Sequence, residues 1–398
     1  MTTDVPTTNA MDEPCVRALH VFGSLNRGGA ETWLMDVMRH ASRGALALDV
    51  CLIGAGAGAY EEEFRDLGGR IFRCPLGRSP WRFSRAFLRL LKSERFTVVH
   101  SHVYLFSGVV LRAAAQAGVP RRIAHIHPVE DVKARRLFRS IYATWMKRWI
   151  VRYGTHFVAP TRDGLDSYWG AGWESDGNKS VLYNGVDVAR FAAPSDGAGV
   201  RRELGLDPGT RIVLNVARFT AHKRHIFLVD VAERLLKRDP DVCFVCIGAG
   251  ALREQVMALT TQKDIDSRFR FVSGAPSIDR YWLAADAFAF PSSNEGFGIV
   301  IAEAAAAGLP VVAQDIPGVR EAARAGHDVA LLPLETEPEP WSRALEAALQ
   351  RGRLDEQARQ RHLNGFPFTI AQSVAALRTL YGIPPTPRDD TPHDYPPS

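Results

Sequence analysis

The sequence predicts an α/β protein of two domains, each a parallel β-sheet with helices on both faces. The chain has 398 residues, which is too long for one ordinary domain and fits two of about 150–200 residues each. Short strand patterns alternate with helical patterns, which is typical of parallel sheets covered on both sides. The second half of the chain then repeats the strand–helix order of the first.

The first half alternates strands and helices from residue 16 onward. Strands are predicted at Val16–Phe22, Leu46–Ile53, Arg70–Cys74, Phe96–His100, Arg122–His127, His156–Ala159 and Val181–Tyr183. Helices are predicted at Thr32–His40, Phe83–Lys92, Gly108–Ala117 and Arg135–Arg152. Several strands end in polar residues or in a glycine-rich turn, and ligands of open α/β sheets bind outside the carboxyl ends of strands.

The second half follows the same logic. Strands are predicted at Arg211–Val216, Val242–Ile247, Arg268–Val272, Ala287–Phe290 and Pro310–Ala313. Helices are predicted at Ile226–Arg238, Leu252–Thr260, Ile278–Ala284 and Ile299–Ala307. Two sheets with facing carboxyl edges would leave a cleft between the domains, which suits a transfer between two substrates.

These patterns place the domain boundaries. We expect a flexible leader over residues 1–14, a Rossmann-like domain over 15–191 and a linker with a short polar helix over 192–210. A second Rossmann-like domain covers 211–365, helical residues 366–383 follow, and a disordered tail covers 384–398.

Composition excludes several classes of protein. No apolar run reaches about 18 residues, so no transmembrane helix is predicted, and the polar start does not resemble a secretory signal. Five cysteines, an odd number, argue against a disulfide framework. Cys243 and Cys246 are three apart on a predicted strand and point to opposite faces, so they do not suit one metal ion. We therefore expect buried thiols and a cytoplasmic protein.

Positive charge is concentrated in the first half. Residues 1–190 contain 26 basic and 18 acidic residues, which gives a net charge of +8. The remainder contains 23 basic and 26 acidic residues, which gives −3. The predicted helix over 133–152 mixes basic with aromatic residues. One interpretation is a solvated basic face with aromatic residues toward the core, and the other is peripheral contact with an anionic membrane. Since no nucleic-acid motif accompanies this helix, no nucleic-acid partner is predicted.

The strongest local motif is the segment from Pro291 to Glu303, where a buried strand ends, a turn follows and a helix begins. Free N–H groups and the positive dipole end make a helix start an anion site. The glycines at 296 and 298 permit close approach of a ligand to the backbone. Glu295 and Glu303 could accept hydrogen bonds from sugar hydroxyls, as acidic residues do for ribose. The alternative is a solvated helix face.

Two further segments follow predicted strands. Arg218 stands just past a strand end and Lys223 follows after a short loop, so two fixed cations could neutralise a diphosphate, although they could also be ordinary surface cations. Gly28 and Gly29 precede a helix and permit close approach to phosphate or sugar. The full GxGxxG spacing is missing, so no dinucleotide fingerprint is predicted.

Histidines form two H-x-H pairs at strand ends, namely His100 with His102 and His125 with His127. Two histidines on one strand face could bind a metal ion. No carboxylate or cysteine completes a ligand set nearby in the sequence, so neither a metal site nor another cofactor is expected.

Together these residues resemble the retaining family 4 glycosyltransferases, which have the GT-B fold, over residues 16–382. The spacing of Glu295 and Glu303 resembles the E-x7-E motif of that family. Arg218 and Lys223 resemble its diphosphate-binding Arg and Lys. Further similar segments are Gly28-Gly29-Ala30-Glu31, Tyr183-Asn184-Gly185-Val186-Asp187 and Ile247-Gly248-Ala249-Gly250-Ala251-Leu252. At Arg224 the chain departs from the family, since many members have Gly there.

The resemblance implies residue roles. Arg218 and Lys223 would hold the donor diphosphate, Glu303 the ribose hydroxyls, and His127 would lie beside the reacting sugar, with His125 as the competing assignment. The predicted catalytic residues are His127, Glu295, Arg218 and Lys223. The predicted donor-binding residues are Gly28, Gly29, Arg218, Lys223, Gly250, Glu295, Phe297, Gly298, Ile299 and Glu303. Asp264-Ile265-Asp266 has the D-x-D spelling of metal-dependent glycosyl transfer, but it lies in a predicted loop, so metal-independent transfer is expected.

The resemblance also implies a function. The first domain would face the acceptor, the second would bind a nucleotide-sugar, and residues 366–383 would cross back to the first domain. The expected reaction moves a sugar with retention from a UDP-sugar, or alternatively GDP-mannose, to a glycan or lipid-linked acceptor in cell-surface polysaccharide or glycolipid biosynthesis. The alternatives are a nucleotide-sugar 2-epimerase on the GT-B fold and a non-catalytic GT-B binding subunit.

Overall fold

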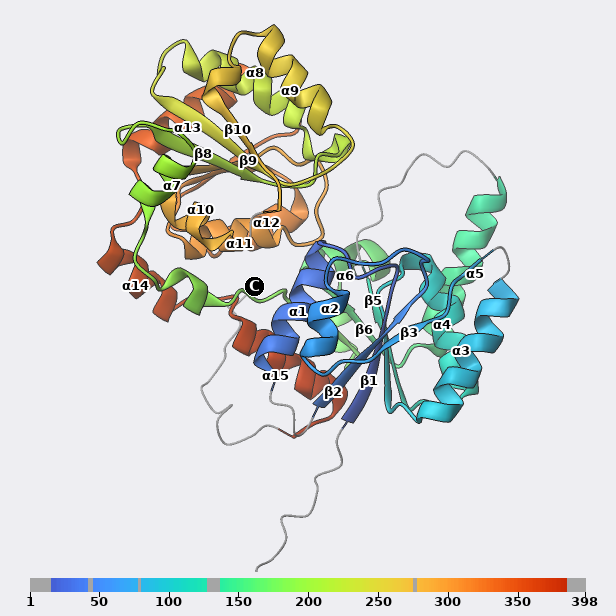
Figure 1. Ribbon diagram of the computed structural model, residues 1–398. Helices are drawn as coiled ribbons and strands as arrows, with labels where there is room; N and C mark the ends of the chain where they lie inside the picture. Colours follow the sequence, from blue (N-terminus) through green and yellow to red (C-terminus); the bar gives the residue numbers. More distant parts are fainter. Residues whose placement is uncertain (1–15, 42–45, 78–79, 127–136, 275–277, 385–398) are drawn as a thin grey trace, which may run out of the picture.

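The computed structural model describes residues 16–41, 46–77, 80–126, 137–274 and 278–384, which form two α/β domains (Figure 1). Each domain contains an open sheet of parallel strands with helices on both faces, which confirms the predicted fold class. The predicted leader lies outside the described residues, as does the predicted tail after Pro384.

The first sheet has seven strands in the order β3-β2-β1-β4-β5-β6-β7, and all neighbours are parallel. The strand order reverses at β1, which lies between β2 and β4. Such a topological switch point is where ligands of open α/β sheets bind. The strands are β1 (Val16–Phe22), β2 (Leu46–Leu52), β3 (Ile71–Arg73), β4 (Val98–Ser101), β5 (Arg121–His125), β6 (His156–Ala159) and β7 (Lys179–Val181).

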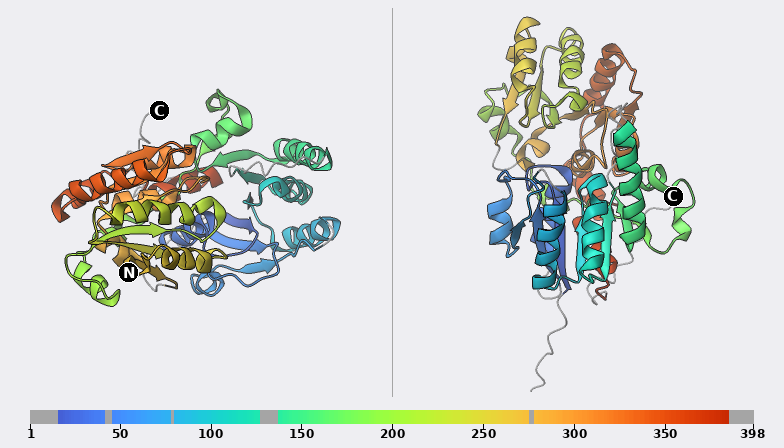
Figure 2. Two further views of the ribbon diagram at one scale, coloured as in Figure 1. Left: turned by 90° about the horizontal axis from the view of Figure 1, so that it is seen from above. Right: turned by 90° about the vertical axis from the view of Figure 1, so that its right-hand side faces the viewer.

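Helices cover both faces of this sheet. One face packs against α1 (Gly29–His40), α2 (Glu61–Asp66) and α15 (Ile370–Tyr381). The other packs against α3 (Pro80–Glu94), α4 (Ser107–Gln116) and α5 (Leu137–Tyr153), with α6 (Arg162–Trp169) beyond. Helices α4 and α5 lie side by side, and the second view of Figure 2 looks onto this face.

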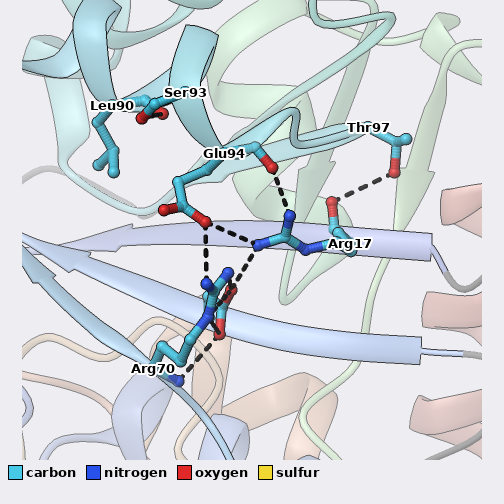
Figure 3. A network of polar contacts seen from close by, with 7 residues as sticks. Arg17, Arg70, Leu90, Ser93, Glu94 and Thr97 are labelled. Carbon is cyan, nitrogen blue, oxygen red and sulfur yellow. Dashed lines mark hydrogen bonds and ion pairs between the residues drawn. The ribbon is translucent and has the colours of Figure 1, made fainter.

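Ion pairs connect α3 to the strands on one side of the first sheet (Figure 3). Glu94, the last residue of α3, binds Arg17 of β1 at 3.1 Å and Arg70 at 2.9 Å. Arg70 also binds the buried carboxylate of Asp49 in β2 at 2.6 Å. Since these charges neutralise one another, we assign the network a role in stabilising the fold. The functional site is expected elsewhere, at the carboxyl ends of the strands.

The second sheet has six parallel strands in the order β10-β9-β8-β11-β12-β13. Its switch point lies between β8 and β11. The strands are β8 (Arg211–Val216), β9 (Val242–Ile247), β10 (Phe269–Val272), β11 (Ala287–Phe290), β12 (Val311–Gln314) and β13 (Val329–Leu332). Helices α8 (His225–Leu236), α9 (Arg253–Gln262) and α13 (Pro338–Arg351) cover one face, and α10 (Asp279–Ala284), α11 (Ile299–Ala306) and α12 (Pro317–Ala323) cover the other.

The segments that precede and follow the second sheet complete the fold: two of their helices pack against the second domain, and the last helix returns to the first domain. Helix α7 (Gly197–Glu203), inside the predicted linker, contacts α10, where Tyr281 donates to Glu203 at 2.7 Å. Helix α14 (Glu356–Asn364) packs on α11. Helix α15 then packs on α1, where the Trp33 indole donates to Ser373 at 2.7 Å.

The observed bounds of seven predicted strands differ from the predicted ones by one or two residues, namely β2, β3, β4, β5, β7, β10 and β12, and two of these differences bear on the site. The strand predicted at Arg122–His127 ends at His125, although the amide of Ile126 still donates to Val158 O at 2.6 Å. The strand predicted at Val181–Tyr183 lies at Lys179–Val181 instead. Tyr183 has already left the sheet because its ring packs against Phe297 and Phe368.

Candidate functional site

Loops that follow β8 and β11 meet at the switch point of the second sheet. The two strands are paired, with Val213 opposite Ala287. Their loops are joined as well, since the His222 carbonyl accepts a hydrogen bond from the Ser293 amide at 2.8 Å. This pairing brings the Arg218–Lys223 segment beside the Pro291–Glu303 segment, which are the two strongest motifs of the sequence.

Lys223 and Glu295 form an ion pair across these two loops. Their side chains are 13% and 14% exposed, so neither is an ordinary surface charge. The Lys223 ammonium also lies 5.1 Å from the centre of the Phe290 ring, which holds it against the end of β11. Thus two predicted site residues hold one another in place at the end of β11.

Glu303 lies on α11 and is buried, which rules out the solvated helix face. Its carboxylate pairs with Arg190 at 3.4 Å, and Arg190 also donates to Asp279 at 2.9 Å. Burial raises the pKa of Glu303 to about 7, and the positive charge of Arg190 opposes that rise. Burial alone would lower the pKa of Arg190. The negative charges of Glu303 and Asp279 outweigh the effect of burial, so the pKa of Arg190 is raised.

The turn between these acids is shaped by Gly298, which caps α11 with φ of 69°, a left-handed conformation that favours glycine. Phe297 before it is buried against Tyr183 and Phe368, so its ring is part of the core and only its backbone is a candidate for ligand contact. Ile299 begins α11, so the helix start follows Glu295 after the short turn that ends at Gly298.

Gly250 has a packing role. Its φ is 152°, and a side chain there would approach the Phe219 carbonyl oxygen to 2.5 Å. The Phe219 amide donates to Ala249 O at 2.9 Å, so this turn supports the loop that carries Arg218. A direct contact between Gly250 and the donor stays a prediction.

Residues of the first domain face this site. Gly28 caps α1, and Gly29 is its first residue. Burial raises the pKa of Glu31 in the same turn, and the Arg218 charge counteracts it across the domain boundary. Arg218 itself is exposed. Burial and Glu31 likewise raise the pKa of Tyr104, and Arg218 lowers it. The charge of Arg218, after β8, therefore acts on residues that follow β1 and β4 of the first domain.

His127 lies outside the described residues. His125, its competitor, is buried at the end of β5 and lies 3.2 Å from His100. His20, which the sequence did not single out, completes a group with His100 and His102 whose ring nitrogens lie within 4.8 Å of one another. The proximity of His20 to His100 and His102 could not be found from the sequence, because it depends on the pairing of β1 with β4.

Sequence reasoning also missed Arg190, Asp279 and Tyr104. Arg190 stands three residues after the Asn-Gly-Val-Asp tract, and no charge pattern links it to Glu303. Tyr104 has φ of 48°, an uncommon backbone conformation for a residue with a side chain, which cannot be read from the sequence.

Site and fold together define a glycosyltransferase with two Rossmann-like domains. The family model described as Glycosyltransferase Family 4 matches residues 27–190, and the model described as Glycosyl transferases group 1 matches residues 199–363. The chain belongs to glycosyltransferase family 4.

Relatives support this assignment. EpsF of Bacillus subtilis (strain 168), described as a glycosyltransferase, is 29% identical over 92% of this chain and 96% of its own. The capsular polysaccharide biosynthesis glycosyltransferase CapH of Staphylococcus aureus is 23% identical over 84% and 91%. The D-inositol 3-phosphate glycosyltransferase of Actinosynnema mirum is 31% identical over 72% of each chain.

Among solved structures, HepE of Anabaena in complex with UDP and glucose has the same fold. Its TM-score is 0.75, with 19% identity over 92% of this chain and 99% of that one. Among the described residues, none of the helices has the length and hydrophobicity that a membrane span requires.

Proposed function

We propose that this glycosyltransferase transfers a sugar with retention of configuration from a nucleotide-diphosphate sugar, without a metal ion. The observation that carries the proposal is the meeting of Lys223, Glu295 and the start of α11 at one switch point, with Arg218 after the same strand as Lys223. Cations and helix N-termini are the groups that stabilise a diphosphate leaving group.

In this reaction the acceptor hydroxyl attacks the anomeric carbon on the face from which the diphosphate departs. The glycosidic bond to phosphate breaks as the new bond forms, and negative charge grows on the phosphate oxygen. Arg218, Lys223 and the amides around Gly298 stabilise that charge. A departing phosphate oxygen takes the acceptor's proton, while His127 or His125 positions the sugar.

The nucleotide would be held by the buried carboxylate. Glu303, in its ionised form beside Arg190, can accept hydrogen bonds from the ribose hydroxyls. We favour a UDP-sugar, with GDP-mannose as the alternative. The UDP bound to HepE, a protein of the same fold, supports this choice. A glycan or lipid-linked acceptor, polysaccharide or glycolipid biosynthesis, and a cytoplasmic location complete the proposal, which the relationship to CapH supports.

Donor hydrolysis without acceptor tests this function. The purified protein is mixed with UDP-, GDP- and dTDP-sugars in EDTA, beside Arg218→Ala and Glu303→Gln. Matched controls are Arg343→Ala and Glu346→Gln on α13, on the opposite face of the second domain. We expect slow hydrolysis of one donor that is lost in the site variants and kept in the controls.

Other outcomes would contradict particular parts of the proposal. Conversion of the donor to an isomer would indicate the epimerase. Donor binding without turnover, even with a panel of acceptors, would indicate the non-catalytic subunit. Activity that EDTA abolishes and a divalent ion restores would overturn metal independence.

We also propose that α5 contacts an anionic membrane. Ile141, Tyr142 and Trp145 are exposed on its first half, while Met146 and Ile150 face the core. Arg148 and Arg152 are exposed on the same helix. Apolar rings beside basic residues suit the membrane interface.

Flotation with vesicles that contain phosphatidylglycerol tests the membrane contact. The double variant Tyr142→Ala/Trp145→Ala should lose flotation, whereas Ile226→Ala/Leu334→Ala, which removes exposed apolar residues of the second domain, should keep it. Wild-type protein that stays with the soluble fraction at physiological salt would overturn the proposal.

A further inference from the structure

Four histidines and one tyrosine form a buried cluster between the first sheet and the helices α1 and α15. His20 lies on β1, His100 on β4, His102 just after β4, and His125 at the end of β5. Tyr381 is the last residue of α15, which returns to this domain from the other. All five side chains are 5% exposed or less. Burial lowers the pKa of His20 to about 3, so that ring is neutral.

Hydrogen bonds connect the five side chains end to end. Nε2 of His102 lies 3.0 Å from Nδ1 of His20, and Nε2 of His20 lies 2.8 Å from the Tyr381 hydroxyl. The same hydroxyl lies 2.9 Å from Nδ1 of His100, whose Nε2 lies 3.2 Å from Nδ1 of His125. The order is therefore His102–His20–Tyr381–His100–His125, with Tyr381 as the central link.

For four neutral imidazoles and one hydroxyl, a count of protons restricts this hydrogen-bonded series to two arrangements. Each of the four links holds one proton, and each neutral imidazole or hydroxyl supplies one. If Nε2 of His102 donates, then His20 donates to Tyr381, Tyr381 to His100, and His100 to His125. Every histidine then carries its proton on Nε2. If Nδ1 of His125 donates instead, all directions reverse, and every histidine carries its proton on Nδ1.

A metal ion is the other way to use such a cluster, because His20, His100 and His102 place ring nitrogens near one another. Both nitrogens of His20 and both of His100, however, already have partners within the cluster. A metal ligand would have to give up such a bond, so the hydrogen-bonded chain accounts for the geometry more completely.

We propose that Tyr381 is a positioning residue, whose hydroxyl forces all four histidines to share one tautomer and so couples the protonated nitrogen of His125 to that of His102 and His20. Conversion between the two arrangements moves one proton across each link, with one proton taken up at Nδ1 of His102 and one released from Nε2 of His125. The last helix of the chain thereby links the hydrogen-bonding role of a histidine at the end of β5 to that of histidines on and after β1 and β4.

This role deepens the proposed function, because His125 lies in the segment that we expect to position the sugar. The tautomers themselves can be measured without substrate, so the inference can fail while glycosyl transfer stands, and the reverse is also true.

Nitrogen-15 NMR of the full chain with labelled histidine tests the proposal. Spectra of single His→Gln variants assign the four rings of the cluster among the twelve histidines. We expect the four to show the same tautomer in the wild type. In Tyr381→Phe the two central links are lost, so the His102–His20 pair and the His100–His125 pair become independent and the population of the His125 tautomer changes.

Tyr281→Phe is the matched control, since Tyr281 is also buried and donates to Glu203 in the second domain. Its spectrum should match the wild type at all four rings. Three results would each overturn the proposal: different tautomers among the four rings of the wild type, a His125 tautomer population that Tyr381→Phe leaves unchanged, or one equivalent of bound zinc in the purified protein.

Discussion

At the scale of single residues, the site depends on a carboxylate that is buried beside an arginine. Glu303 was predicted from its spacing to Glu295, but its partner Arg190 is 113 residues away in the sequence. Spacing along a chain can reveal a motif on one turn and helix, whereas a contact between distant segments requires the fold. The cost of burying Glu303 appears as a pKa of about 7, which makes its ionisation relevant near neutral pH.

Donor binding should therefore strengthen as the pH rises through about 7, because Glu303 ionises there and an ionised carboxylate accepts hydrogen bonds more strongly. Arg190→Gln removes the charge that opposes the raised pKa. In that variant we expect the midpoint to move to higher pH and UDP binding at neutral pH to weaken about tenfold, or about 1.4 kcal/mol. Calorimetric titration of UDP across this pH range measures both effects.

The control for Arg190 is Arg211→Gln. Arg211 pairs with Asp239 at the amino end of β8, on the opposite edge of the sheet from the site. Its titration curve should coincide with that of the wild type. If Arg190→Gln left the midpoint unchanged, Arg190 would not influence the ionisation of Glu303.

At the scale of elements, buried strands were the most predictable features and polar helices the least. The bounds of β1, β6, β8, β9 and β11 coincide with the predicted ones, because each is a short apolar run between polar turns. Helix α14 was not predicted, since EQARQRHLN has few apolar residues. Its Arg359 is buried and donates to the carbonyl of Ala193 at 3.0 Å, which is a tertiary contact that no periodicity reveals.

The start of α8 departs from the family pattern at Arg224, and the structure gives the consequence. Arg224 has φ of 53° and ψ of 39°, a left-handed conformation that costs a residue with a side chain roughly 1–2 kcal/mol. Its guanidinium binds Gln314 and lies 4.1 Å from the centre of the Phe227 ring, which offsets the strain.

Two substitutions separate the backbone from the side chain at this position. Arg224→Gly and Arg224→Ala both lose the side-chain contacts, but only Ala retains the strain. We expect the Gly variant to be more stable than the Ala variant by about 1 kcal/mol, measured as free energy of unfolding in urea.

The order should invert at Arg343, in the exposed interior of α13, where Gly is about 1 kcal/mol worse than Ala. If Ala were the better residue at both positions, the strain assigned to Arg224 would be absent in solution.

At the scale of the whole molecule, the second domain buries ionisable groups of opposite kinds around the site. Burial, followed by the charge of Lys223, lowers the pKa of His225 to about 4, while burial raises that of Glu303 to about 7. His225 stacks on Phe219 at 4.1 Å between ring centres, under the loop that carries Arg218. The sequence predicted the facing domains but could not indicate these shifts, because they depend on how completely each side chain is covered.

These two groups should bend the pH dependence of stability in opposite directions. Between about pH 5 and 6.5, the unfolded chain protonates His225 while the folded chain does not, so this residue makes stability fall as pH falls. Over the same range the folded chain protonates Glu303 while the unfolded chain does not, so this residue makes stability rise as pH falls. Each can contribute up to about 1.4 kcal/mol per pH unit.

Urea unfolding at several pH values should therefore show a flatter acid decline in His225→Gln and a steeper one in Glu303→Gln than in the wild type. The slope is the diagnostic quantity, since either substitution can also lower stability uniformly through lost packing. Slopes that shift in the same direction would mean that one of the two groups is solvated in the folded protein. Opposite shifts would show that the folded chain holds a neutral base and a high-pKa acid around the same strand edge, ready for a charged donor.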